Sequence, residues 1–117
     1  MPNLLRFGSH RERQEQAFAC LQRGVDCYAI RCEALSIARQ NGMGDWTITL
    51  QDHERLAGGC IHETKEIFLV PTFMTDVAEA RDTVLHELSH AMQMLDHGVA
   101  FEACRSYLLQ KHPDLAK

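Results

Sequence analysis

Apolar residues recur every three to four positions near both ends of the chain, and this spacing predicts helices. The first predicted helix runs from about His10 to Gln22 and is ended by Gly24. A second helix, or a continuation of the first, ends at Asn41-Gly42 and is marked by apolar positions at helical spacing: Val25, Tyr28, Ala29, Cys32, Leu35 and Ala38. A last helix is predicted over about residues 100–110. Both ends of the chain are therefore expected to be helical.

The middle of the chain follows a different pattern. Residues 46–50 alternate apolar and polar side chains, which is typical of a strand exposed on one face. A short strand over residues 58–61 leads through a polar turn at 63–65 into residues 67–70, which are apolar on both faces and so indicate a covered strand. Pro71 ends it. The chain is thus expected to form one α+β domain over residues 1–117, with a three-stranded sheet that contains a hairpin.

The longest helical pattern runs without proline or glycine from Asp76 to His97. Asp76 is the expected N-cap, and Glu79, at the third position, is expected to reach back to it. Apolar residues at helical spacing form a stripe that should face the core. The stripe consists of Val77, Ala80, Val84, Leu85, Leu88, Ala91, Met92 and Leu95.

Beside this stripe, residues 86–90 read His-Glu-Leu-Ser-His, the H-E-x-x-H spacing of zinc hydrolases. Residues four apart on a helix lie one turn above each other, so His86 and His90 should project from one face, about 6 Å apart. Two imidazoles at that separation can share one tetrahedral Zn²⁺. Glu87 is not needed as a ligand, and lies where a general base for a water on zinc is expected. Two ordinary helix histidines are the simpler reading, but the glutamate and the helix beneath favour a metal site.

Composition and charge narrow the class of protein. The chain has 117 residues, of which 45% are hydrophobic and 24% charged, as in an ordinary single globular domain. The net charge of −4 and the absence of a Lys/Arg run argue against nucleic-acid binding by general electrostatics. No apolar stretch approaches signal-peptide or membrane-span length, so no membrane partner is expected.

The cysteines suggest a reducing compartment. Their number is odd and none are in C-x-x-C spacing, which disfavours a disulfide framework or a second zinc site. We expect all five to be reduced, small apolar core residues of a cytoplasmic protein. They are Cys20, Cys27, Cys32, Cys60 and Cys104.

Three ordered segments, within residues 46–109, resemble the peptidase core of the SprT-like family of zinc metallopeptidases. Residues 56–60, Leu-Ala-Gly-Gly-Cys, with the strand at 67–69, are similar to the family's A-G hairpin and I-x-L strand. Residues 83–91 are similar to its apolar-flanked H-E-x-x-H-A, and residues 97–101 to its H-G-x-x-F. The resemblance implies a small zincin-like domain with zinc on His86, His90 and His97.

The identity of the third ligand depends on the short gap between His90 and His97. On a straight helix these residues would be about 10 Å apart along the axis, too far to share a metal. The helix is therefore expected to end near Met94 and the chain to double back. Asp96 and Glu102 remain alternative carboxylate ligands.

Three protein ligands would leave the fourth zinc position to water, as in a catalytic site. The expected activity is that of a zinc metalloendopeptidase, in which Glu87 takes a proton from that water and returns it to the leaving amine. Tyr107 or His62 could donate a hydrogen bond to the oxyanion. The partner would be a protein or peptide substrate, held extended along an exposed edge strand.

Two other interpretations compete with the peptidase. A zinc-binding module that mediates protein interactions and cleaves nothing would have nearly the same sequence. Glu87 argues against it, because zinc binding does not need this carboxylate whereas water activation does. A fortuitous motif in a metal-free helical protein is disfavoured by the ordered hairpin and the H-G-x-x-F segment.

Overall fold

The computed structural model describes residues 5–6, 10–92 and 98–116. Within these ranges the helices are α1 (His10–Gln22), α2 (Cys27–Gln40), α3 (Val77–Met92) and α4 (Val99–Lys111). The strands are β1 (Leu5–Arg6), β2 (Thr47–Leu50), β3 (Asp52–His53), β4 (Gly58–Ile61) and β5 (Glu66–Leu69). Two short 3₁₀ helices complete the fold, η1 (Pro71–Phe73) and η2 (Pro113–Ala116). The chain is an α+β domain, as the sequence predicts.

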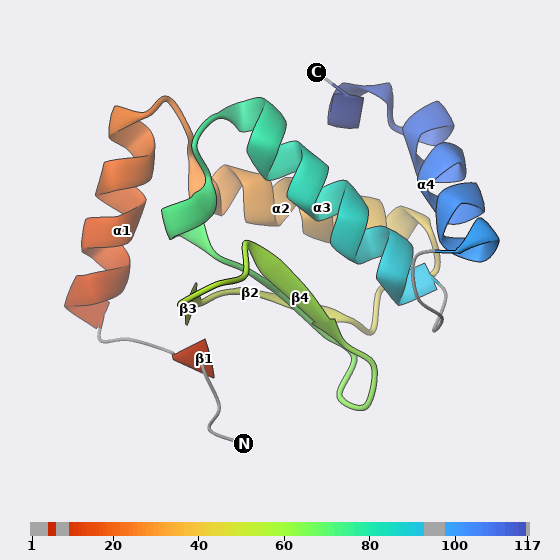
Figure 1. The fold of residues 1–117 in the computed structure, drawn as a ribbon, viewed down its shortest axis with the longest axis horizontal. Helices are drawn as coiled ribbons and strands as arrows, with labels where there is room; N and C mark the ends of the chain where they lie inside the picture. Colours follow the sequence, from red (N-terminus) through yellow and green to blue (C-terminus); the bar gives the residue numbers. More distant parts are fainter. Residues whose placement is uncertain (1–4, 7–9, 93–97, 117) are drawn as a thin grey trace.

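A three-stranded sheet with the order β2-β5-β4 forms the floor of the domain (Figure 1). β4 and β5 are antiparallel, with Gly58 opposite Leu69, and form the predicted hairpin. The apolar strand β5 is central and its residues Ile67, Phe68 and Leu69 are buried, which confirms the prediction of a covered strand. β2 lies parallel to β5 on the other side, a pairing that the sequence pattern does not specify.

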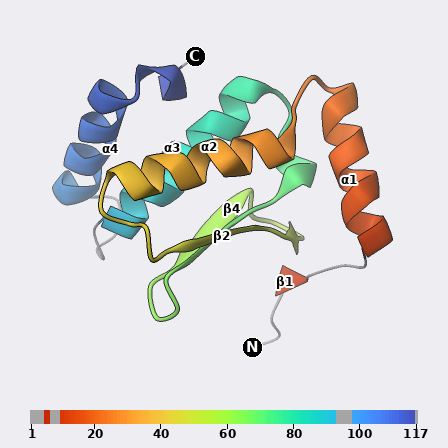
Figure 2. The same ribbon diagram turned by 180° about the vertical axis from the view of Figure 1, so that it is seen from behind.

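Helices α2 and α3 lie over the same face of this sheet, and both views of the ribbon show them there (Figures 1 and 2). Four of the eight residues of the predicted apolar stripe of α3 are buried in the shared core: Ala80, Val84, Leu85 and Leu88. Val77, Ala91 and Met92 are half-buried against this core, and Leu95 lies outside the described residues. Helical spacing therefore identified the correct face of α3.

Helix α1 lies at the margin of the domain (Figure 1). Gly24, with a φ of +81°, separates it from α2, so the two are distinct helices. Cys20 is buried, but Phe18 and Leu21 are 62% and 57% exposed. Ala17 also packs against the core. Arg23, directly after α1, adds polar contacts: its guanidinium donates hydrogen bonds to the carbonyl oxygens of Met74 (2.9 Å) and Pro71 (3.0 Å).

Two features differ from the sequence-based expectations. β1 pairs antiparallel with β3, and because each strand is only two residues long, neither gives a periodic signal. All five cysteines are free thiols, but only Cys20 and Cys27 are buried, Cys60 and Cys104 are half-buried, and Cys32 is exposed. The prediction of five core thiols is therefore wrong for Cys32, which lies on the solvent side of α2.

None of the helices in the described ranges is long and apolar enough to cross a membrane.

Candidate metal centre

The candidate site is carried by α3, whose start is defined by its first residues. The Asp76 carboxylate accepts a hydrogen bond from the Glu79 backbone N–H at 2.8 Å, which confirms the predicted N-cap. From there the helix runs to Met92 and includes the whole of residues 86–90. The motif therefore lies on a regular helix that is anchored in the core.

His86 and His90 point to the same place. Their Nε2 atoms are 3.2 Å apart, and their rings are steeply inclined, with centroids 4.8 Å apart. Two nitrogens bound to one tetrahedral zinc at about 2.0–2.1 Å would be about 3.3 Å apart. The same distance also fits a hydrogen bond in which one ring donates and the other accepts. The distance therefore fits two imidazoles that either form a hydrogen bond with each other or bind one metal ion.

Phe101 of α4 forms a wall beside this pair. Its side chain is 3% exposed, and its ring centroid lies 5.1 Å from that of His86 and 4.8 Å from that of His90. An apolar ring on both imidazoles restricts their rotation and excludes water from one side. The sequence placed Phe101 in a motif, and its packing on both histidines gives that motif a physical role.

Glu87 lies between the helix and strand β4. Its side chain is 7% exposed, and this burial raises the pKa of its carboxyl to about 7. Burial, and secondarily the charge of Glu87, raises the pKa of the Cys60 thiol on β4 to about 12, so that thiol is neutral near pH 7. A Cβ atom added to Gly58 of β4 would lie 3.3 Å from Cγ of Glu87, so Glu87 is at the interface of α3 with β4.

Gly58 allows this close approach. A Cβ atom at Gly58 would be 2.9 Å from Cγ2 of Thr83, 3.0 Å from the carbonyl oxygen of Phe68 and 3.3 Å from Cγ of Glu87. The first two distances are too short for a methyl group, and the backbone oxygen cannot easily move. Glycine at this position therefore determines how closely β4 passes Glu87. A Gly-Gly pair opening a short strand was the sequence signal for such an approach.

The third ligand cannot be placed in the same way. His97 and Asp96 lie outside the described residues, whereas Glu102 is exposed in the first turn of α4. The expected end of the helix near Met94 also lies outside the described residues. Beyond that gap, α4 packs against α3, and its Phe101 lies against the histidine pair. No group of three His, Cys, Asp or Glu residues suited to a metal occurs among the residues described, a set that omits 93–97.

The two oxyanion candidates have other contacts. His62 follows β4 and packs edge-on against Trp46, with ring centroids 5.3 Å apart. Tyr107 is 46% exposed on α4, and its hydroxyl lies 3.5 Å from the Lys111 ammonium. These contacts are those of ordinary packed and surface side chains, and no role in the site follows from them.

Comparisons of the chain with protein-family models, with characterised proteins and with solved structures found no match. The SprT-like resemblance therefore stays a prediction from the motifs.

Proposed function

We propose that this protein is a zinc-dependent peptidase in which His86 and His90 hold the metal and Glu87 transfers protons. The observation that carries the proposal is the 3.2 Å separation of the two Nε2 atoms, close to the spacing that one tetrahedral zinc requires. Zinc bound there would supply a Lewis acid and lower the pKa of a bound water. The first candidate for the third ligand is His97, with Asp96 and Glu102 as alternatives.

Glu87 supports catalysis over simple metal binding. Its buried carboxylate is adjacent to His86 in the helix and is not needed as a zinc ligand. A carboxylate held beside the metal can accept a proton from an attacking water and return it to a leaving amine. A protein that only bound zinc would have no use for an acid buried here.

The position of β4 supports a peptide as substrate. β4 lies at the edge of the three-stranded sheet, and Gly58 brings it to the Glu87 side chain. An extended peptide can add to such an edge through main-chain hydrogen bonds, which would align its carbonyl groups along the catalytic helix. The substrate class proposed is therefore an unfolded protein segment or peptide.

The decisive experiment separates zinc binding from cleavage. Glu87→Gln should retain about one zinc per chain by elemental analysis but lower the cleavage rate of an unfolded protein about 10²- to 10⁴-fold, because the amide cannot accept the proton. Glu79→Gln, an exposed glutamate on the same helix, is the matched control and should cleave like wild type. Zinc binding without cleavage by wild type would indicate the interaction module, and a protein that cannot bind zinc would refute both.

The third ligand is tested by three alanine variants. His97→Ala should weaken zinc affinity by orders of magnitude, whereas Asp96→Ala and Glu102→Ala should change it little. His112→Ala serves as a control for loss of a histidine, because its ring contacts the Asn41 amide, 3.0 Å away. Retention of zinc in His97→Ala, with loss in a carboxylate variant, would assign the ligand to that carboxylate.

A further inference from the structure

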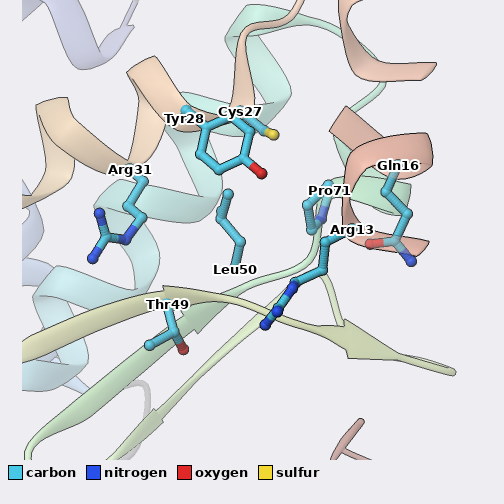
Figure 3. Close-up of a pocket in the computed structure, with 8 residues that line it drawn as sticks. All are labelled: Arg13, Gln16, Cys27, Tyr28, Arg31, Thr49, Leu50 and Pro71. Atoms are coloured by element: carbon cyan, nitrogen blue, oxygen red, sulfur yellow. The ribbon is translucent and has the colours of Figure 1, made fainter. Parts of the chain in front are cut away.

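A cavity of about 350 Å³ lies between α1, α2, β2 and η1 (Figure 3). This volume is within the range of small-molecule binding pockets. Its lining contains none of the residues of the candidate metal centre. Polar groups come from Arg13 and Gln16 of α1, from Tyr28 and Arg31 of α2, and from Thr49 of β2.

The charge of the cavity is opposite to that of the protein as a whole. The chain has a net charge of −4, yet the cavity is lined by two arginines and by no aspartate or glutamate. In the described part of the chain, neither Arg13 nor Arg31 is in an ion pair. Two guanidinium groups without carboxylate partners create a positive potential that favours an anion.

Arg31 is held in position before any ligand binds. Its Nε donates a hydrogen bond to the carbonyl oxygen of Ile48 at 2.6 Å, on strand β2. This bond orients the planar guanidinium and leaves its terminal N–H groups to other acceptors. A guanidinium fixed in this way loses little freedom when it binds a carboxylate or phosphate in a bidentate manner.

The remaining lining is apolar. Leu50 and Pro71 contribute aliphatic surface, and Tyr28 contributes an aromatic ring that is 52% exposed. In Figure 3 the Leu50 side chain and the Tyr28 ring lie between Arg31 on one side and Arg13 on the other. Burial raises the pKa of the Cys27 thiol to about 11, so the cavity wall carries no thiolate that would repel an anion.

We propose that this cavity is a binding site for a small organic anion. Its phosphate or carboxylate group would be bound by Arg13 and Arg31, and its apolar part would lie on Leu50, Pro71 and the Tyr28 ring. The apolar surface of Leu50, Pro71 and Tyr28 favours a ligand with an apolar part, and the two arginines favour a ligand with an anionic group.

Phenyl phosphate is a suitable probe, and isothermal titration calorimetry with amide chemical-shift mapping is the measurement. Phenyl phosphate should bind to the full chain and shift amide signals of α1, α2 and β2. Inorganic phosphate should bind at least tenfold more weakly, because it has no apolar part to cover Leu50, Pro71 and the Tyr28 ring. Benzyl alcohol, which has the ring without the charge, should also bind at least tenfold more weakly.

Arg13→Gln should weaken phenyl phosphate binding about tenfold or more by removing one charged donor. Arg11→Gln is the matched control on the same helix, because Arg11 is paired with Glu15 and does not line the cavity. Arg31→Gln should have at least the effect of Arg13→Gln. Arg31 also donates a hydrogen bond to β2, so Arg31→Gln could unfold the protein. In that case Arg13→Gln still tests the proposal.

Three results would overturn the proposal: no binding of phenyl phosphate at millimolar concentration, equal binding by Arg13→Gln and wild type, or binding of inorganic phosphate as tight as that of phenyl phosphate. None of these measurements involves zinc or peptide cleavage. Failure here would therefore leave the peptidase proposal untouched.

Discussion

Helices α1 and α3 have similar lengths but contribute to the domain in different ways. Six residues of α3 are buried, among them Leu85 and Leu88, and its capped start and core-facing stripe make it part of the folded interior. On α1, Cys20 is buried in the core, whereas Phe18 and Leu21 remain largely exposed. Hydrogen bonds from Arg23, directly after α1, connect this end of the helix to η1. Helix α3, which is held by apolar burial, gives the His86–His90 pair a rigid frame. Helix α1 buries little apolar surface, and the cavity lined by Arg13 and Arg31 lies beside it.

Truncating a side chain on the buried face of α3 should have the largest effect on the free energy of unfolding. Leu88→Ala should destabilise the protein by about 3 kcal/mol, because Leu88 is 1% exposed and its loss leaves a cavity in the core. Leu21→Ala on α1 should change the free energy of unfolding by less than about 0.5 kcal/mol. Urea denaturation measures both, and equal losses would show that α1 is as firmly packed as α3.

Substitution at the contact of α3 with β4 should lower stability almost as much. Gly58→Ala should cost about 1–3 kcal/mol in the free energy of unfolding, since its methyl group would force β4 away from Thr83 and Glu87. It should also lower the proposed peptidase activity by more than the loss of stability explains, when activity is measured well below the unfolding temperature. At Gly44 a Cβ would meet only Cγ of Arg39 at 3.8 Å, so Gly44→Ala is the matched control. If Gly58→Ala kept wild-type activity, the position of β4 would not matter for the site.

The hydrogen bonds of Arg23, directly after α1, should also make a measurable contribution to stability. Arg23→Ala should destabilise the protein by about 1–3 kcal/mol, because two carbonyl oxygens, those of Met74 and Pro71, lose a charged donor. In hydrogen exchange, amides of α1 should lose protection before those of α3. A uniform loss of protection across both helices would contradict the view that α1 is attached separately.

The smallest predicted effect concerns the helix caps. Asp76→Ala should destabilise the protein by about 1 kcal/mol, because the Glu79 N–H loses its acceptor at the start of α3. Asp26→Ala removes the corresponding bond to the Ala29 N–H at the start of α2. Thermal unfolding should show similar losses for both, since the caps are alike although the helices carry different chemistry. A negligible change in Asp76→Ala would show that packing alone holds the first turn.

The helices and the main strands could be predicted because their signals are local. Asp76, the apolar stripe of α3 and Gly24 each determine the backbone within one or two turns, and the structure agrees at all three places. The two-residue pair of β1 with β3 could not be predicted, because its residues are brought together only by the fold. The exposure of Cys32 was also missed, because the sequence pattern places Cys32 among the apolar positions that mark α2. The residues of α2 that the fold buries are Cys27, Ile30, Ala34, Ile37 and Ala38.

The sequence by itself determined that His86, Glu87 and His90 lie on one helix, because helical periodicity relates residues one turn apart without any tertiary contact. Only the tertiary structure decided what surrounds them: the Phe101 ring against both imidazoles, β4 beside Glu87, and the parallel pairing of β2 with β5. It alone brought Arg13 and Arg31 to one cavity. Such contacts join residues far apart in the chain, and they depend on how side chains of the whole core pack together.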